Sequence, residues 1–466
     1  MKNGQTSDHA WAVEELGQAD LGDPRRQRRA AQVVAAVAAH PTASLPRACG
    51  TWAATKGAYR FLSNPAVQPR ALRAAHQART LERMADQPML LLVQDTTQVD
   101  FTTQRHTAGL GPIHTRSRPR QGLLVHTTLA VSAEGLPLGV VDQQVWARDP
   151  NLAGQAQQRK QRPIADKESR KWLTALTAST AELPAEQRTL VVADREADVY
   201  DLFVAERADG VELLIRAAHD RAVLASDTDP TRLWAAAQAL PEQDRREVQV
   251  PRGDERPGRT ATLSLRWGSF DLKPPRARAG EHLAAVRVQV VLVEEVDPPD
   301  GATPLQWLLL TTLDVHSVAA AWQVTDWYSY RWRIEQFHYV LKSGCRIEQL
   351  QLDTAERLER ALALYSLAAW RLLWLTLAAR TTPHVSAEPV LRREEWQTLW
   401  CVHHHQPTPP EEPPTLREAV RWIAQLGGFL ARRGDGEPGV KTLWLGWQRL
   451  MDMTLGFQTA RLSTSG

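Results

Sequence analysis

The hydrophobic pattern of the chain changes from helical to strand-like near residue 89. Residues 1–70 show the spacing of short amphipathic helices. The run MLLLVQDTT that starts at residue 89 is continuously apolar and then ends in Gln-Asp-Thr-Thr, the pattern of a buried strand with polar residues at its tip. Apolar runs at 122–132 and 135–147 predict a hairpin, and 189–207 predicts a strand followed by a helix. This order predicts an α/β fold.

The pattern of the second half predicts more strands and then mostly helices. Residues at about 211–313 form a strand-rich block that is divided by clusters of Pro, Gly and Asp. Because helical spacing resumes directly afterwards, we interpret this block as an inserted sheet. One long helix is expected from Ser317, a suitable N-cap, to Gly344, a residue type that ends helices. A second helix is expected at about 354–379, and two amphipathic helices close the chain.

Length and composition favour a soluble protein of several domains. With 466 residues, 43% of them hydrophobic and 23% charged, the chain exceeds one ordinary core. Three distant cysteines predict no disulfide framework, which favours a reducing, cytoplasmic compartment. The polar N-terminus lacks the apolar run of a signal peptide, and the apolar stretch 372–379 is too short to span a bilayer. Residues 101–171 hold 11 Lys/Arg against 5 Asp/Glu, which is compatible with a polyanionic partner or with a solvated surface.

Two aspartates follow runs of strand-forming residues, and strand ends are where α/β folds place their sites. These are Asp95 and Asp194. For either one alone, a turn or capping role is the commoner explanation. Two such residues in one chain indicate a shared site more strongly than one does.

The predicted long helix carries a polar face. Its members stand at offsets 0, 3, 7 and 14: Tyr328, Arg331, Glu335 and Lys342. One alternative is a solvated stripe with an Arg331–Glu335 ion pair. Against it stand the aromatic residues Trp327, Trp332 and Phe337, which would bury the rest of the helix and leave the polar face in a cleft.

Three carboxylates with nearby cations fit the chemistry of phosphodiester cleavage. Mg²⁺ prefers hard oxygen ligands, and two such ions stabilise the entering and leaving oxygens of a phosphoryl transfer. Asp95, Asp194 and Glu335 would bind the ions, with one aspartate shared between them. Arg331 and Lys342 would contact neighbouring phosphates.

Nine segments carry a resemblance over essentially the whole chain. They are LGDPRR (21–26), GAYRFLSNP (57–65), QDTT (94–97), KESRKWL (167–173), ADREAD (193–198), TPLQWLLLT (303–311), YSYRWRIEQFH (328–338), LGGF (426–429) and LWLGW (443–447). Their order and content resemble the cut-and-paste DDE transposases of the IS-four group, which include the Tn-five transposase. The resemblance implies a ribonuclease-H-like catalytic core with a β-sheet insertion, and Asp95, Asp194 and Glu335 as its metal triad.

The resemblance also implies the domains and the roles of single residues. Residues 1–70 would bind the transposon end, 71–370 would form the catalytic domain, and 371–466 would dimerise. Trp307, otherwise a core strand residue by its apolar setting, would support a flipped base. The DNA or phosphate contacts would be Tyr328, Arg331, Lys342 and Arg216, together with an N-terminal patch that includes Arg25, Arg26 and Arg60. Tyr339 stands where the Tn-five transposase has Lys, which puts one phosphate contact in doubt.

We therefore expect a transposase that cuts transposon ends through a hairpin and joins them to target DNA. The expected cofactor is Mg²⁺, with Mn²⁺ as a substitute, at two ions per active site. The expected partners are double-stranded DNA and a second copy of the chain, in a bacterial cytoplasm and on its nucleoid, without a membrane. The alternatives are a structure-specific endonuclease and a catalytically inactive DNA-binding inhibitor on the same fold. The CVHHH segment (401–405) is interpreted as a surface histidine run, not a zinc site, and no ATP-binding loop is expected.

Overall fold

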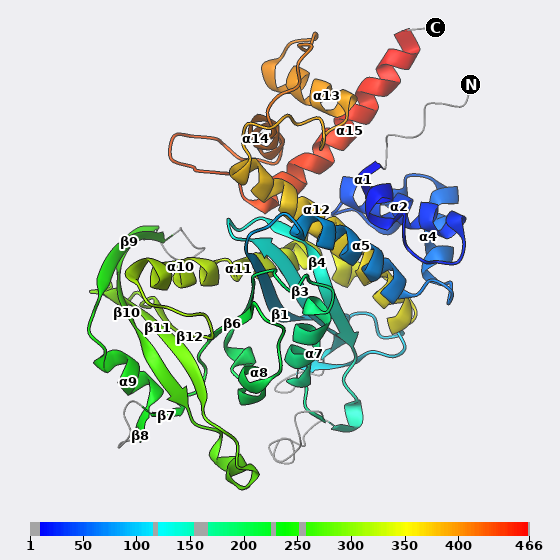
Figure 1. Ribbon diagram of the computed structural model, residues 1–466. Helices are drawn as coiled ribbons and strands as arrows, with labels where there is room; N and C mark the ends of the chain where they lie inside the picture. Colours follow the sequence, from blue (N-terminus) through cyan, green and yellow to red (C-terminus); the bar gives the residue numbers. More distant parts are fainter. Residues whose placement is uncertain (1–9, 115–119, 153–165, 225–229, 251–257, 465–466) are drawn as a thin grey trace. The chain divides into compact units, whose positions relative to one another are not determined.

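The computed structural model describes residues 10–114, 120–152, 166–224, 230–250 and 258–464 (Figure 1). The chain divides into two compact units, one of residues 1–87, 96–155 and 333–466, and the other of residues 88–95 and 156–332. The chain passes from one unit to the other within strand β1 (Leu90–Asp100) and again at the start of helix α11 (Trp332–Tyr339). Part of the basic stretch at 101–171 lies outside the described residues.

The second unit is built on a mixed sheet. The first half of β1 pairs in parallel with β5 (Thr189–Ala193), and β5 pairs in parallel with β6 (Val211–Arg216). These strands are almost fully buried, as strands covered on both faces are. The other edge of β6 pairs antiparallel with β12 (Gln306–Thr311).

Antiparallel strands extend this sheet beyond β12. They are β11 (Val286–Val296), β10 (Arg259–Leu272), β9 (Asp244–Val250), β7 (Ala222–Leu224) and β8 (Pro230–Arg232). The helices of the unit are α7 (Arg170–Thr180), α8 (Tyr200–Val204), α9 (Leu233–Ala239) and α10 (Val318–Ser329). The predicted α/β fold class is confirmed, and the strands expected between 211 and 313 are present.

The first unit combines helices with an antiparallel sheet. Strand β3 (Arg120–Ser132) pairs with β2 (Gly111–His114) and with β4 (Pro137–Trp146), as the predicted hairpin requires. The helices before β1 are α1 (Ala10–Leu16), α2 (Pro24–Ala39), α3 (Leu45–Cys49), α4 (Trp52–Leu62) and α5 (Pro69–Met84). Those that follow α11 are α12 (Ala355–Thr381), α13 (Arg393–His404), α14 (Leu416–Leu426) and α15 (Val440–Thr464).

Helix α12 is the central helix of the first unit. It packs against α2, α4, α5, β4, α14 and α15, and Figure 1 shows it running between the N-terminal and C-terminal helices. Its length and composition would allow it to cross a membrane, yet 89% of its apolar window is buried within the protein. We interpret it as a core helix, and its bounds confirm the helix expected at about 354–379.

The long helix expected from Ser317 to Gly344 is interrupted, so that prediction is wrong. Ser317 caps α10 by accepting the Ala320 N–H, as expected. The Ser329 hydroxyl then donates to the carbonyl oxygen of Asp326 at 2.6 Å. The Tyr330 N–H donates to the carbonyl oxygen of Trp327, three residues earlier, instead of to the residue four earlier. Such side-chain bonds compete with the helical pattern and end α10. Helix α11 starts afresh two residues later and continues into one π-helical turn, Val340–Gly344.

A buried polar cluster joins α1, α5 and β4 in the first unit. The Glu15 carboxylate accepts hydrogen bonds from His76 Nδ1 and Arg83 Nη1, both at 2.6 Å. The Val140 N–H donates to His76 Nε2, so this imidazole is neutral with its proton on Nδ1. Although burial would raise the pKa of Glu15, the His76 hydrogen bond and the Arg83 charge lower it to about 2. Burial lowers the pKa of His76 against the pull of Glu15.

This cluster predicts acid sensitivity below neutral pH. Because His76 stays neutral when folded, the unfolded chain takes up an extra proton below pH 6.5, and the free energy of unfolding falls as the pH falls through that range. The contribution of Glu15 is complete above about pH 4.5 and is lost between there and about pH 2. His76→Gln retains hydrogen bonding but cannot titrate, so between pH 7 and 5 its stability should depend less on pH than that of the wild type. Thermal melts of both proteins between pH 7 and 5 measure this dependence. An equal change of melting temperature with pH in the two proteins would contradict the prediction.

Candidate active site

Strands β1 and β5 bring the two predicted aspartates to neighbouring positions. Their parallel register runs from Leu90 opposite Thr189 to Gln94 opposite Ala193, so Asp95 within β1 and Asp194 just after β5 each follow the last paired residue. Neighbouring strands lie about 4.8 Å apart, and residues in register on parallel strands point to the same face. Both aspartates are half-buried, after strands that are fully buried. The expectation that Asp95 lies at the tip of its strand is wrong, because β1 continues to Asp100.

Asp194 is fixed by a local hydrogen bond. It caps the short 3-10 helix Arg195–Ala197, and its Oδ1 accepts the N–H of Glu196 at 2.9 Å. That bond occupies one carboxylate oxygen and sets the side-chain direction. The carboxylate is therefore held in place beside the end of the β1–β5 pair.

Nearby, Asp198 ties the end of β5 to the end of β6. Its buried carboxylate accepts the N–H groups of Ala218 and His219 and forms an ion pair with Arg221 at 2.6 Å. A carboxylate so fully hydrogen-bonded is stable in a buried position. Asp198 therefore belongs to the scaffold of the site, and it fixes the strand end that carries Arg216.

Four of the predicted DNA-contacting residues meet around Tyr328 in the second unit. The Trp307 ring of β12 meets the Tyr328 ring edge-on, with 5.3 Å between the centroids. The Arg331 guanidinium lies 6.0 Å from the Tyr328 ring centroid. Arg216, at the end of β6, donates to the Gln306 carbonyl at 2.8 Å, next to Trp307 in sequence. Tyr328, Arg331, Arg216 and Trp307 therefore lie close together, while their contact with DNA stays a prediction.

Burial and the charges of nearby residues act on the pKa values of Tyr328 and Arg216. Burial raises the pKa of Tyr328; the charges of Arg331 and Arg216 oppose the rise, and that of Asp194 adds to it. The phenol thus stays protonated and can donate a hydrogen bond. Burial also lowers the pKa of Arg216, an effect that Tyr328 opposes and that the charges of Arg195 and Arg331 reinforce. Several guanidinium groups close together beside a carboxylate are the arrangement that binds phosphate groups.

Glu335 and Lys342 belong to the first unit. Glu335 lies on the first turn of α11, and Lys342 lies in the π-helical turn. The Lys342 ammonium donates to the Gln98 carbonyl at 2.9 Å and forms an ion pair with Glu348 at 3.3 Å. Because α10 and α11 are separate, the four polar residues do not share one continuous helix face. Trp332, expected to be buried, is 58% exposed, whereas Phe337 is fully buried.

The N-terminal arginines differ in exposure. Arg25 is exposed at the start of α2, but Arg26 is half-buried and donates to the Leu21 carbonyl at 2.7 Å. Arg60 is exposed on α4, and the same helix presents Lys56 about one turn earlier and Trp52 about two turns earlier. Trp52 is 78% exposed, which is unusual for so large an apolar ring. The sequence pattern did not single out Trp52 and Lys56, although Trp52, Lys56 and Arg60 follow one another at intervals of four residues.

Comparison with known families divides the chain into three matched segments. Residues 8–67 match a transposase DNA-binding family, residues 100–371 match a transposase DDE domain, and residues 367–466 match a Tn5 transposase dimerisation domain. The DDE match alone covers more than half of the chain. The chain belongs to the DDE transposases. Asp194 and Glu335 lie within the DDE match, and Asp95 precedes it by five residues.

The family assignment confirms the resemblance. A DDE transposase depends on divalent metal ions, binds DNA and dimerises. Within the described residues, no group of three or more His, Cys, Asp or Glu side chains is placed to hold a metal. Asp95 and Asp194, which follow the last paired residues of β1 and β5, offer hard carboxylate oxygens, and Glu196 engages one oxygen of Asp194. The donor type therefore fits Mg²⁺.

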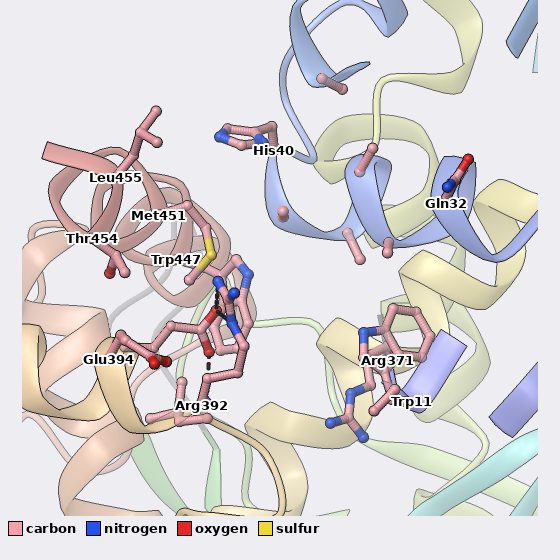
Figure 2. A pocket seen from close by; sticks show the side chains of 18 of the residues that line it. Trp11, Gln32, His40, Arg371, Arg392, Glu394, Trp447, Met451, Thr454 and Leu455 are labelled. Carbon is pink, nitrogen blue, oxygen red and sulfur yellow. Dashed lines mark hydrogen bonds and ion pairs between the residues drawn. The ribbon is translucent and has the colours of Figure 1, made fainter. Parts of the chain in front are cut away.

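Two further features of this transposase lie outside the candidate site. His403 stacks on Trp422 and His404 stacks on Trp400, so these histidines of the CVHHH segment are engaged by aromatic rings. A cavity of about 1190 Å³ lies among α2, α13 and α15 (Figure 2). On its wall, the Arg371 guanidinium lies 5.4 Å from the Trp11 ring, and burial lowers its pKa to about 10. Neither feature includes a candidate catalytic residue.

Proposed function

We propose that this transposase cuts the ends of its element and joins them to target DNA, using Asp95, Asp194 and Glu335 as ligands of two Mg²⁺ ions. The observation that carries the proposal is that Asp95 and Asp194 directly follow the last paired residues of the parallel strands β1 and β5, while the charge of Asp194 acts on Tyr328. Bound ions would stabilise charge on the attacking and leaving oxygens. Glu335, seven residues after Tyr328 and on the next helix, would be the third carboxylate ligand.

The chain's own residues would bind and orient the DNA. Arg216 and Arg331 would contact phosphates beside the scissile bond, and Tyr328 would donate a hydrogen bond to one of them. Water would hydrolyse one strand, breaking the P–O bond to leave a 3′-hydroxyl. That hydroxyl would attack the opposite strand to close a hairpin, a second water would open it, and the 3′-hydroxyl would then attack target DNA. Trp307, half-buried beside Tyr328, would stack on the extruded base of the hairpin.

Two DNA ends must be held together for insertion, so we propose that a dimer joins them through the C-terminal domain, on bacterial nucleoid DNA. Lys342 would have to leave Glu348, or share it, in order to contact a phosphate. A plasmid carrying two copies of the DNA that flanks this gene, a second target plasmid and Mg²⁺ provide the test. Excision followed by joined products supports the proposal. Cleavage without joining would indicate the endonuclease alternative, and binding without cleavage would indicate the inhibitor.

The α4 stripe of Trp52, Lys56 and Arg60 gives a prediction about DNA affinity. Lys56→Ala combined with Arg60→Ala should weaken end binding by roughly ten-fold at moderate salt and lower the slope of log K against log salt by about 2, because two phosphate contacts are removed. Binding titrations at several salt concentrations measure both quantities. Arg417→Ala on α14, an equally exposed arginine paired with Glu437, is the control and should leave the slope unchanged. An unchanged slope in the double variant would exclude the stripe from the DNA interface.

A further inference from the structure

The last turn of α10 is attached to strand β9 by an unusual set of polar contacts. Arg246 of β9 makes a bidentate ion pair with Asp326 of α10, and its guanidinium also lies 4.2 Å from the centre of the Trp322 ring. The buried Trp322 indole donates through Nε1 to Asp244 of β9 at 2.7 Å. Trp322 and Asp326 are one helical turn apart, so they present one face of α10 to β9.

These contacts are more specific than an ordinary surface ion pair. A single exposed pair contributes little to stability, because water screens it and two flexible side chains must be ordered. Here a planar guanidinium fork meets a carboxylate and stacks on an indole, and the indole is itself hydrogen-bonded to the same strand. Such an arrangement fixes both the rotation of α10 about its axis and its position along β9.

The contacts act on the turn that carries Tyr328. The Asp326 carboxylate binds Arg246, while the Asp326 carbonyl accepts the Ser329 hydroxyl that ends the helix. Tyr328 lies between these two residues and meets Trp307 from β12. Strands β9 and β12 belong to the same sheet, through β10 and β11 (Figure 1). The sheet therefore touches the last turn of α10 on two sides.

We propose that Arg246, Asp244, Trp322 and Asp326 form a clamp of positioning residues, which sets Tyr328 and Arg331 against Arg216 and Trp307. The clamp does not touch DNA in this proposal; it acts through the residues that do. It rests on the proposed function, because it assumes that the Tyr328 cluster orients DNA for cleavage. Small displacements of orienting groups slow a reaction strongly even when binding persists.

The test separates orientation from binding and from folding. Arg246→Met keeps the aliphatic stem over Trp322 but removes the fork, and the nearly isosteric Asp326→Asn removes the charge from the other side. With DNA flanking this gene as the probe, each variant should lower the single-turnover cleavage rate roughly ten-fold at saturating DNA. The dissociation constant, measured with Ca²⁺ in place of Mg²⁺, should change less than about two-fold. The double variant should be no slower than either single one, because the two residues act as one unit.

Arg287→Met is the matched control. Arg287 forms a pair with Asp271 at 3.2 Å across β10 and β11 of the same sheet, away from α10, and its loss should leave the cleavage rate unchanged. A wild-type rate in both clamp variants, effects that multiply in the double variant, or a rate loss matched by an equal loss of DNA affinity would overturn the clamp. Failure of the proposed function has a different signature, since the wild-type protein itself would not cleave the probe.

Discussion

Asp194→Asn should lower the rate of transposon-end cleavage by about a thousand-fold or more while leaving DNA binding intact. The amide oxygen of asparagine can still accept the Glu196 N–H, so the local turn is retained and only the negative charge and one hard oxygen are lost. Losing a member of a catalytic set that acts as a unit has effects of this size. Asp95→Asn and Glu335→Gln are expected to behave in the same way. Single-turnover cleavage in Mg²⁺ and gel-shift binding in Ca²⁺ measure the two properties separately.

Glu196→Gln is the control for this prediction. Glu196 stands in the same ADREAD segment, two residues after Asp194, but its carboxylate is exposed and pairs with Lys171 at 3.1 Å. The cleavage rate of Glu196→Gln should stay within about two-fold of the wild-type rate, since the amide can still accept a hydrogen bond from Lys171. Any variant of the triad that retains cleavage within ten-fold would exclude that residue as a metal ligand. If Glu335→Gln alone stayed active, the third ligand would have to be sought elsewhere in the chain.

The placement of the aspartates was largely predictable from sequence, but the extent of β1 was not. An apolar run before each aspartate predicts two buried strands, and neighbouring parallel strands bring their ends together. The pattern does not show that β1 continues past Asp95. Its last residues and the residue that follows it lie beside a segment about twenty residues further along the chain. The Phe101 N–H donates to the Gln121 carbonyl, and a Cβ on Gly122 would clash with the Val99 carbonyl. Strand length depends on such distant partners, which local periodicity does not encode.

The polar residues after 317 show a different limit. Their spacing predicted one continuous helix, because periodicity alone cannot reveal that the Ser329 hydroxyl donates to the Asp326 carbonyl and ends α10. The interruption places Arg331 in a turn, from which its guanidinium reaches the Tyr328 ring. The clamp could not be predicted from the sequence either, because Arg246 and Asp326 are separated by eighty residues and only the folded sheet brings them together.

Gly427 of the LGGF segment and Gly446 of the LWLGW segment allow α14 and α15 to pack backbone to backbone. A Cβ at Gly446 would lie well within the van der Waals distance of the Ile423 carbonyl, and a Cβ at Gly427 would meet the Thr442 carbonyl in the same way. Both neighbours are main-chain atoms of the other helix, so no side chain can move aside. The resemblance in these two segments therefore has a structural reason within the dimerisation domain.

Gly446→Ala should accordingly destabilise the C-terminal helices by about 3 kcal/mol or more, because overpacking against backbone forces the helices apart. Denaturant unfolding monitored by tryptophan fluorescence measures this loss, and Trp444 and Trp447 lie on either side of the substitution. Gel filtration with DNA ends should show weaker dimer formation as a consequence.

Gly456→Ala on the same helix distinguishes close packing from helix propensity. A Cβ at Gly456 meets nothing within 4 Å, so alanine there should be neutral or stabilise α15 by roughly 0.5–1 kcal/mol, the usual gain over glycine in a helix. Opposite signs at two positions of one helix follow only if the backbone contact with α14 is present in solution. If Gly446→Ala were as stable as Gly456→Ala, the two helices would have to lie further apart than the structure places them, and the glycines of both segments would need another explanation.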